Sequence, residues 1–125
     1  MKIVSTEKAP KAIGPYSQAV EAKGFVFCSG QIGINPSSGN VEGTTIEEQT
    51  RQVMNNLSAV LQAAGSDLGK VVKCTVFLQD IEEFQAFNEV YGEFFSSNPP
   101  SRTTIQAGKL PRGAKVEIDA IAMRD

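Results

Sequence analysis

The spacing of hydrophobic residues divides the chain into strand-like and helix-like segments. Strand side chains point to alternate faces, and buried strands are apolar throughout. These two patterns predict five strands, at 18–21, 25–29, 71–78, 103–107 and 116–123. Apolar residues three or four positions apart predict two amphipathic helices, at 46–64 and 84–95. This order predicts an α+β fold, one domain over residues 1–125, with both helices on one face of a mixed sheet.

Local signals indicate where these segments begin and end. Ala22-Lys23-Gly24 lies between the first two strands and predicts a hairpin turn. Thr45 and Glu48 have the spacing of a capping box, so Thr45 is the expected N-cap of the first helix and Gly65 its C-cap. Asp80 is expected to cap the second helix at its start, before the double proline at 99–100 ends it.

The last two predicted strands carry two charged residues of opposite sign. We expect these strands to pair with each other through the turn at 110–113, which places Arg102 and Glu117 on adjacent strands. Arginine is a planar donor of two parallel hydrogen bonds to a carboxylate, and glutamate can orient or deprotonate a water. The pair therefore indicates a site for hydrolysis of a small anionic substrate.

The pattern of the central strands points beyond a single subunit. A sheet with helices on one face should have strands that alternate apolar and polar residues. The segment 71–78 barely alternates, and Ile121 and Met123 share a face with Glu117. A crowded small core would explain this, but we prefer the interpretation that another copy of the chain covers the second face and that the site lies near the boundary.

Composition excludes several classes of function. The chain has 125 residues, of which 41% are hydrophobic and 21% charged, as in ordinary globular domains. The net charge of −2 gives no basic surface for nucleic acid or acidic membranes. It has neither a run of eighteen apolar residues nor a signal-peptide core, so no membrane association is expected and the cytoplasm is the expected compartment.

The cysteine and histidine content narrows the chemistry further. Cys28 and Cys74 are the only cysteines, and both lie in apolar runs, where we expect buried free thiols rather than a disulfide. Histidine is absent, so Ser-His and Cys-His devices and the usual zinc sites are excluded. We expect no metal and no cofactor.

Four motifs, taken together, resemble the RidA family, also called YjgF. They span the chain in order, without large insertions: Gly14-Pro15-Tyr16-Ser17-Gln18-Ala19, Ser29-Gly30-Gln31-Ile32, Asn88-Glu89-Val90-Tyr91, and Pro100-Ser101-Arg102-Thr103 continuing to Val116-Glu117-Ile118. The resemblance implies a chorismate-mutase-like fold and a homotrimer with three sites at the subunit interfaces. It also implies hydrolysis of 2-enamine and 2-imine acids, such as 2-aminoacrylate and 2-iminobutanoate, to 2-keto acids and ammonia.

The resemblance also assigns roles to individual residues. Arg102 matches the carboxylate-binding arginine, Glu117 the water-positioning glutamate and Tyr16 the site tyrosine. The residues that match positions lining or shaping the pocket are Ser29, Gly30 and Asn88. Thr104 stands where many members have a cysteine. If that position acts through its backbone N–H little is lost, whereas if the thiol matters the activity or substrate preference changes.

The implied chemistry agrees with the residues present. Arg102 can hold the substrate carboxylate while Glu117 takes a proton from the attacking water, and Tyr16 can donate to the nitrogen or to a water. We expect Glu117 to be ionised, with Arg102 nearby opposing any rise of its pKa on burial.

Structural interpretations stay open for each of these residues. Arg102 is also suited to an ion pair with Glu117 or Asp119, Glu117 to a solvent-facing strand edge, and Tyr16 to the core. Two other functions are carried as alternatives. One is an endoribonuclease or translation inhibitor, with Arg102, Arg112 and Lys115 gathered in a trimer cleft. The other is a non-catalytic regulatory protein that binds small carboxylates.

Overall fold

The computed structural model describes residues 1–124 as a sheet covered by two helices. The helices are α1 (Ile46–Ala63) and α2 (Phe84–Phe94). The six strands of the main sheet are β1 (Lys2–Val4), β2 (Ala19–Ala22), β3 (Phe25–Gln31), β6 (Val71–Leu78), β7 (Ser101–Gln106) and β8 (Val116–Met123). A separate two-stranded ribbon joins β4 (Ile34–Asn35) to β5 (Asn40–Val41).

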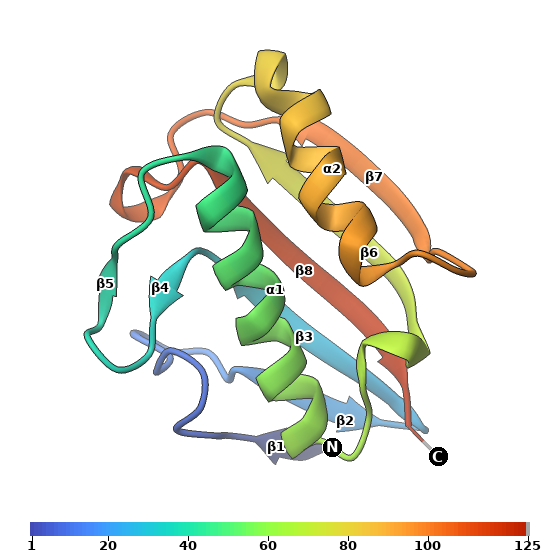
Figure 1. Ribbon diagram of the computed structural model, residues 1–125. Coiled ribbons are helices and arrows are strands. Elements are labelled where there is room, and N and C mark those ends of the chain that lie inside the picture. Colours follow the sequence, from blue (N-terminus) through green and yellow to red (C-terminus); the bar gives the residue numbers. More distant parts are fainter. Residues whose placement is uncertain (125) are drawn as a thin grey trace.

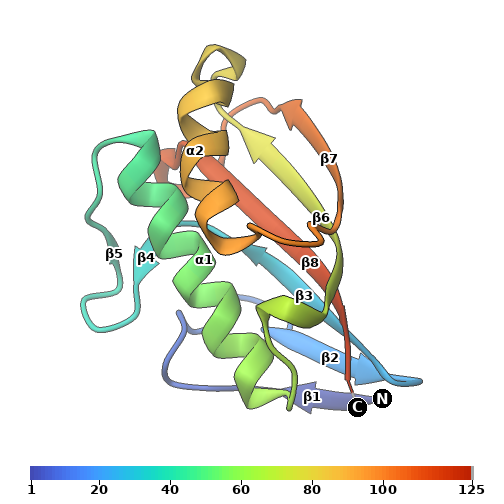
Figure 2. The ribbon, with the colours of Figure 1, turned by 45° about the vertical axis from the view of Figure 1, so that its right-hand side comes forward.

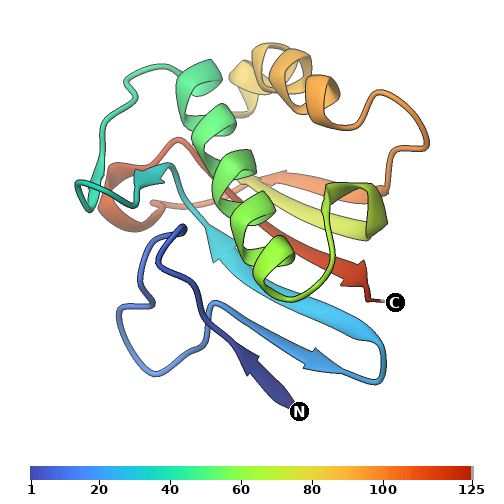
Figure 3. The same cartoon turned by 60° about the horizontal axis from the view of Figure 1, so that its bottom comes forward.

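The sheet has the strand order β1-β2-β3-β8-β6-β7, so β8 lies in the interior and β1 and β7 form the edges (Figure 1). Both helices lie on the same side of this sheet, as Figures 2 and 3 show from two further directions. All strand pairs are antiparallel except β6 with β7, which is parallel. The predicted α+β class, the mixed sheet and the single helical layer are therefore confirmed.

The start of α1 is fixed by the predicted capping box. The Thr45 hydroxyl accepts from the backbone N–H of Glu48, and the Glu48 carboxylate accepts from the backbone N–H of Thr45. These bonds satisfy donors that the first helical turn leaves unpaired. At the other end Ala64 is the cap, and Gly65 follows it with a φ of 80°. The predicted stop at Gly65 is thus correct within one residue.

The hairpin β2–β3 and the start of α2 also follow the sequence signals. Lys23 and Gly24 both have positive φ, at 54° and 81°, as a two-residue turn that matches the twist of its strands requires. The Asp80 carboxylate accepts from the Glu82 N–H and caps a single 3₁₀ turn, and α2 continues from this turn at Phe84.

The expected pairing of the last two strands is wrong. β7 pairs in parallel with β6, and β6 separates it from β8. The physical reason is the connection through α2, because a strand, a helix and a following strand in short succession form a crossover that brings the two strands together in parallel. Arg102 on β7 and Glu117 on β8 therefore do not lie on adjacent strands.

The residues of β8 alternate strictly between the two faces of the sheet. Four of them are buried under the helices: Val116, Ile118, Ala120 and Ala122. The opposite face of the sheet has no covering layer within residues 1–124 and carries apolar side chains such as Phe25, Phe27 and Met123, which are 39%, 42% and 47% exposed. Its cover by another copy stays a prediction.

The two cysteines are buried and free, as expected. Cys28 on β3 and Cys74 on β6 both pair with Ala120 of β8, so a whole strand separates them. Neighbouring strands lie about 4.8 Å apart, so the two Cα atoms are about 10 Å apart, too far for a disulfide. Burial, chiefly, raises the pKa of Cys28 to about 12 and also raises that of Cys74.

We therefore expect neither thiol to react with a thiol reagent in the native protein at pH 8. Both should react once the protein is unfolded in guanidinium, because the reactive form is the exposed thiolate. Ellman's reagent added before and after denaturation measures this directly. Rapid native labelling of either cysteine would contradict the burial described above.

Candidate functional site

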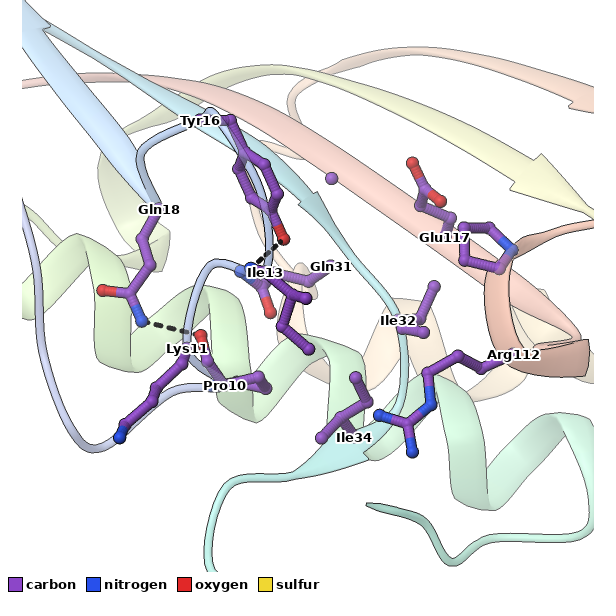
Figure 4. A pocket seen from close by; sticks show the side chains of 12 residues that line it. Pro10, Lys11, Ile13, Tyr16, Gln18, Gln31, Ile32, Ile34, Arg112 and Glu117 are labelled. Carbon is purple, nitrogen blue, oxygen red and sulfur yellow. Dashed lines mark hydrogen bonds between the residues drawn. The ribbon is translucent and has the colours of Figure 1, made fainter. Parts of the chain in front are cut away.

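A pocket of about 350 Å³ opens beside the interior strands β3 and β8. Three of its lining residues, Tyr16, Gly30 and Glu117, were predicted as site residues from the sequence. Tyr16 comes from the loop before β2 and Glu117 from β8, and they lie on two sides of the pocket (Figure 4). The other lining residues are Pro10, Lys11, Ile13, Gln18, Gln31, Ile32, Ile34, Pro111 and Arg112.

Tyr16 is held by a tight local turn rather than by the core. Gly14 has a φ of 127°, which favours glycine, and the Tyr16 N–H donates to the Gly14 carbonyl over 2.9 Å. The backbone N–H of Ile13 donates to the Tyr16 hydroxyl over 3.3 Å. The side chain remains 52% exposed, which excludes the interpretation of Tyr16 as a core aromatic within one chain.

Glu117 lies against Gly30 on the neighbouring strand. A methyl group added to Gly30 would lie 2.3 Å from a carboxylate oxygen of Glu117, which is far inside van der Waals contact. Gly30 therefore leaves the space that the carboxylate occupies. Burial, and then repulsion by Asp119 on the same strand, raise the pKa of Glu117 above its ordinary value.

The N-terminal wall of the pocket depends on a buried glutamine. The Gln18 amide donates to the carbonyls of Thr6 and Pro10 over 3.0 and 2.7 Å, and its oxygen accepts from the Thr6 N–H over 2.7 Å. These bonds tie the segment before Tyr16 to β2. Ser29, which was expected to line or shape the pocket, is not among its lining residues in the single chain, but its hydroxyl donates to the Ser17 carbonyl over 2.6 Å and so holds the same loop.

Arg102 and Asn88 form a second cluster, away from the pocket. Arg102 Nη1 donates to Asn88 Oδ1 over 2.8 Å. The guanidinium carbon lies 4.8 Å from the centre of the Tyr91 ring and 5.4 Å from that of Phe84. Arg102 forms no ion pair with Glu117 or Asp119 within residues 1–124, so the ion-pair interpretation does not hold in the single chain.

Within one chain, Arg102 and Glu117 lie on opposite faces of the sheet. Arg102 is paired with Cys74, which faces the helices, whereas Glu117 is paired with Phe77 on the uncovered face. The expected influence of Arg102 on the pKa of Glu117 is therefore wrong for the single chain, where burial and Asp119 determine the shift. Thr104 shares the face of Arg102, and its hydroxyl is buried without a hydrogen-bond partner.

The sequence interpretation missed most of the pocket wall. Ile13, Ile32 and Ile34 supply its apolar surface, and Arg112 lies at its edge (Figure 4). Arg112 Nη1 donates to the Gly39 carbonyl over 2.9 Å, which ties the last turn to the β4–β5 ribbon. These residues belong to irregular segments and to the short strand β4, where apolar positions have no period. No pattern in the sequence therefore marks them as neighbours.

In the part of the chain that the structure describes, no group of three or more Asp, Glu, His or Cys residues is arranged to hold a metal ion. None of its helices combines the length and the hydrophobicity needed to cross a membrane.

The fold and the site define a small α+β domain that carries a pocket carboxylate and, on its other face, a positioned arginine. The family described as Endoribonuclease L-PSP matches residues 6–124. Human 2-iminobutanoate/2-iminopropanoate deaminase is 46% identical to this chain, in an alignment that covers 98% of this chain and 90% of the human protein. A RutC family protein of Saccharolobus solfataricus is 50% identical over 98% of both chains.

A solved structure extends this similarity to three dimensions. Escherichia coli TdcF, with bound serine, superposes with a TM-score of 0.95 and 41% identity over the full length of both chains. The chain belongs to the RidA (YjgF) family. The resemblance based on the four sequence motifs is thereby confirmed.

The approach of Gly30 to Glu117 gives a structural prediction. Gly30→Ala should fold normally but move the Glu117 carboxylate by about 1 Å, because the added methyl group meets the end of a flexible side chain. A crystal structure and a thermal melt of the variant measure the two effects. Gly108→Ala is the matched control, since its added methyl would meet no heavy atom within 4 Å. An unmoved carboxylate in Gly30→Ala would refute the close contact.

Proposed function

We propose that the protein hydrolyses reactive 2-imino and 2-enamino acids to 2-keto acids and ammonia. The observation that carries the proposal is the presence of two groups in one chain: a carboxylate in the pocket, Glu117, and an arginine whose guanidinium is already positioned, Arg102. The human relative named for this activity is 46% identical over nearly the whole chain, and TdcF was solved with serine, itself a small carboxylate. Both support the substrate class.

The reaction needs positioning and one acid–base group. Arg102 binds the substrate carboxylate through two parallel hydrogen bonds, which fixes the adjacent imine carbon. Glu117 accepts a proton from a water as the water oxygen bonds to that carbon. The proton then passes to the nitrogen, which gives a carbinolamine. Transfer of the carbinolamine hydroxyl proton to the nitrogen, as the C=O bond forms, breaks the C–N bond, and ammonia leaves with its electron pair to give the 2-keto acid. Tyr16 donates a hydrogen bond to the nitrogen or to the water.

We further propose that the complete site forms between two subunits of a homotrimer. Arg102 and Glu117 face opposite sides of one sheet, so a small substrate can reach both only if they come from different copies. The uncovered sheet face, with its exposed Phe25, Phe27 and Met123, provides apolar surface for such an assembly. In this site, Gly30 leaves room for the Glu117 carboxylate, and Asn88 orients the Arg102 guanidinium.

Thr104 is proposed to act through its backbone. Its hydroxyl is buried inside the subunit and its side chain faces the helices, away from Glu117. The N–H groups of an edge strand, by contrast, point outward toward a neighbouring molecule at every second residue. The replacement of a cysteine by threonine then leaves the chemistry unchanged.

Mixing two impaired variants tests both proposals. Arg102→Ala should lose carboxylate binding, and Glu117→Gln should bind the carboxylate but turn over slowly. Refolded together in equal amounts, they should recover about a quarter of the wild-type rate, because one site in four (a half times a half) then joins an intact Arg102 to an intact Glu117. The rate is measured as 2-ketobutanoate release behind a threonine dehydratase, in the presence of a scavenger for the free imine.

The possible outcomes distinguish the proposed deaminase activity from the proposed position of its site between subunits. A wild-type protein that does not accelerate release beyond the dehydratase alone would eliminate the deaminase. Active wild type with no recovery on mixing would place Arg102 and Glu117 in the same chain. A sedimentation mass near that of one subunit would eliminate the trimer.

The raised pKa of Glu117 gives a pH prediction. The base must be ionised, so the rate should fall as the pH falls through the pKa of Glu117, at a midpoint above that of an ordinary glutamate, about 4.3. Asp119→Asn removes the repulsion between the two carboxylates and should lower this midpoint. A ¹³C NMR titration of the Glu117 carboxyl, beside the pH–rate profile, measures the shift. Glu47→Gln, on the exposed side of α1, is the control; an equal midpoint in Asp119→Asn and wild type would contradict the electrostatic effect.

An RNA-cleaving function is the second candidate, favoured by the description of the matching family as Endoribonuclease L-PSP. Of the three cations considered for it, Lys115 lies 3.6 Å from the Glu83 carboxylate and Arg112 is engaged by the β4–β5 ribbon. The net charge of −2 also disfavours RNA. RNA cleavage that survives nuclease-free repurification and persists in Arg102→Ala would support it.

Binding of 2-ketobutanoate without any turnover would instead support the carboxylate-binding regulator.

A further inference from the structure

Three aromatic rings of α2 surround the guanidinium group of Arg102. The guanidinium carbon lies 4.8 Å from the centre of the Tyr91 ring, 5.4 Å from that of Phe84 and 5.7 Å from that of Phe87. These rings occur at the first, fourth and eighth residues of the helix and therefore line its sheet-facing side. We call these three residues the aromatic cage.

The cage and Asn88 together restrict the guanidinium in complementary ways. Aromatic faces attract the flat, weakly hydrated cation within about 6 Å of their centres. Asn88 accepts a hydrogen bond from Nη1. Within residues 1–124 no partner engages Nε or Nη2 of Arg102, so the edge formed by these two nitrogens is free to bind a carboxylate through two parallel bonds.

We propose that Phe84 and Tyr91 are positioning residues that hold Arg102 ready for the substrate carboxylate. This inference rests on the proposed function, because it assigns Arg102 a carboxylate to bind. An arginine that is already ordered loses less side-chain freedom on binding than one that samples many rotamers. The cage therefore strengthens substrate binding without contacting the substrate.

The test compares rings that touch Arg102 with one that does not. Phe84→Leu and Tyr91→Leu should raise KM, and the dissociation constant of 2-ketobutanoate measured by calorimetry, by about threefold and about tenfold respectively. kcat should change by less than about twofold, because the lost interaction serves substrate and transition state equally. Phe94→Leu, on the same helix but without a contact to Arg102 in residues 1–124, is the matched control and should bind like the wild type.

A conservative variant separates positioning from stability. The Tyr91 hydroxyl has no hydrogen-bond partner of good geometry, with the Cys74 thiol as a polar neighbour, so Tyr91→Phe keeps the ring and should bind normally. In ¹⁵N NMR spectra, the Arg102 side-chain Nε–H signal should show the upfield ring-current shift of a caged group. This shift should diminish in Phe84→Leu and Tyr91→Leu, and persist in Phe94→Leu.

The outcomes distinguish this inference from the proposed function. If the wild type binds 2-ketobutanoate through Arg102 but hydrolyses no imine, and the cage variants weaken that binding, the cage stands and the deaminase fails. If the wild type hydrolyses imines while folded Phe84→Leu and Tyr91→Leu bind 2-ketobutanoate as tightly as wild type, the cage is refuted. An unshifted Arg102 signal in the wild type would also refute it.

Discussion

The alternation of β8 between two environments is the constraint on which the candidate site depends. Every second residue from Val116 to Ala122 must lie under the helices, where burial of apolar surface stabilises the fold. The residues between them are therefore forced onto the other face, and Glu117 is one of these. Arg102 pairs with Cys74 of β6, which is buried under the helices, and this register places Arg102 on the helical face. The separation of the two charges is thus a property of the packed core.

This separation gives the two faces of the domain different tasks. The uncovered face and the loops at its edge form the pocket. A tight turn at Gly14 holds Tyr16 there, and the absence of a side chain at Gly30 leaves room for Glu117. On the helical face, residues of α2 in the same chain contact Arg102 and restrict its side chain. The contacts that hold Glu117 and those that hold Arg102 do not depend on each other. Neither face alone carries both Arg102, which binds the substrate carboxylate in the proposed reaction, and Glu117, which is the base.

The sequence predicted what is encoded locally and failed where distant segments meet. The capping box at Thr45, the hairpin turn at Lys23 and the apolar run of β6 are short-range patterns, and each appears in the structure where it was expected. The partner of β7 was mispredicted because its exposed, polar residues do not mark a neighbour, and the strand–helix–strand order of β6, α2 and β7, which favours parallel pairing, was not applied. Family resemblance named Tyr16, Gly30 and Glu117, which the fold brings together, but spacing could not reveal that Arg102 turns away from them.

The aromatic cage has a consequence for the proposed assembly of subunits. Ordering a long arginine side chain normally opposes association, because rotamer freedom is lost when the interface closes. Here that freedom is already restricted during folding of the single chain, by α2 and Asn88. In the proposed assembly, the arginine would therefore meet the neighbouring subunit as an ordered part of the surface, and formation of the site would depend on the fit of two surfaces rather than on the ordering of a flexible side chain.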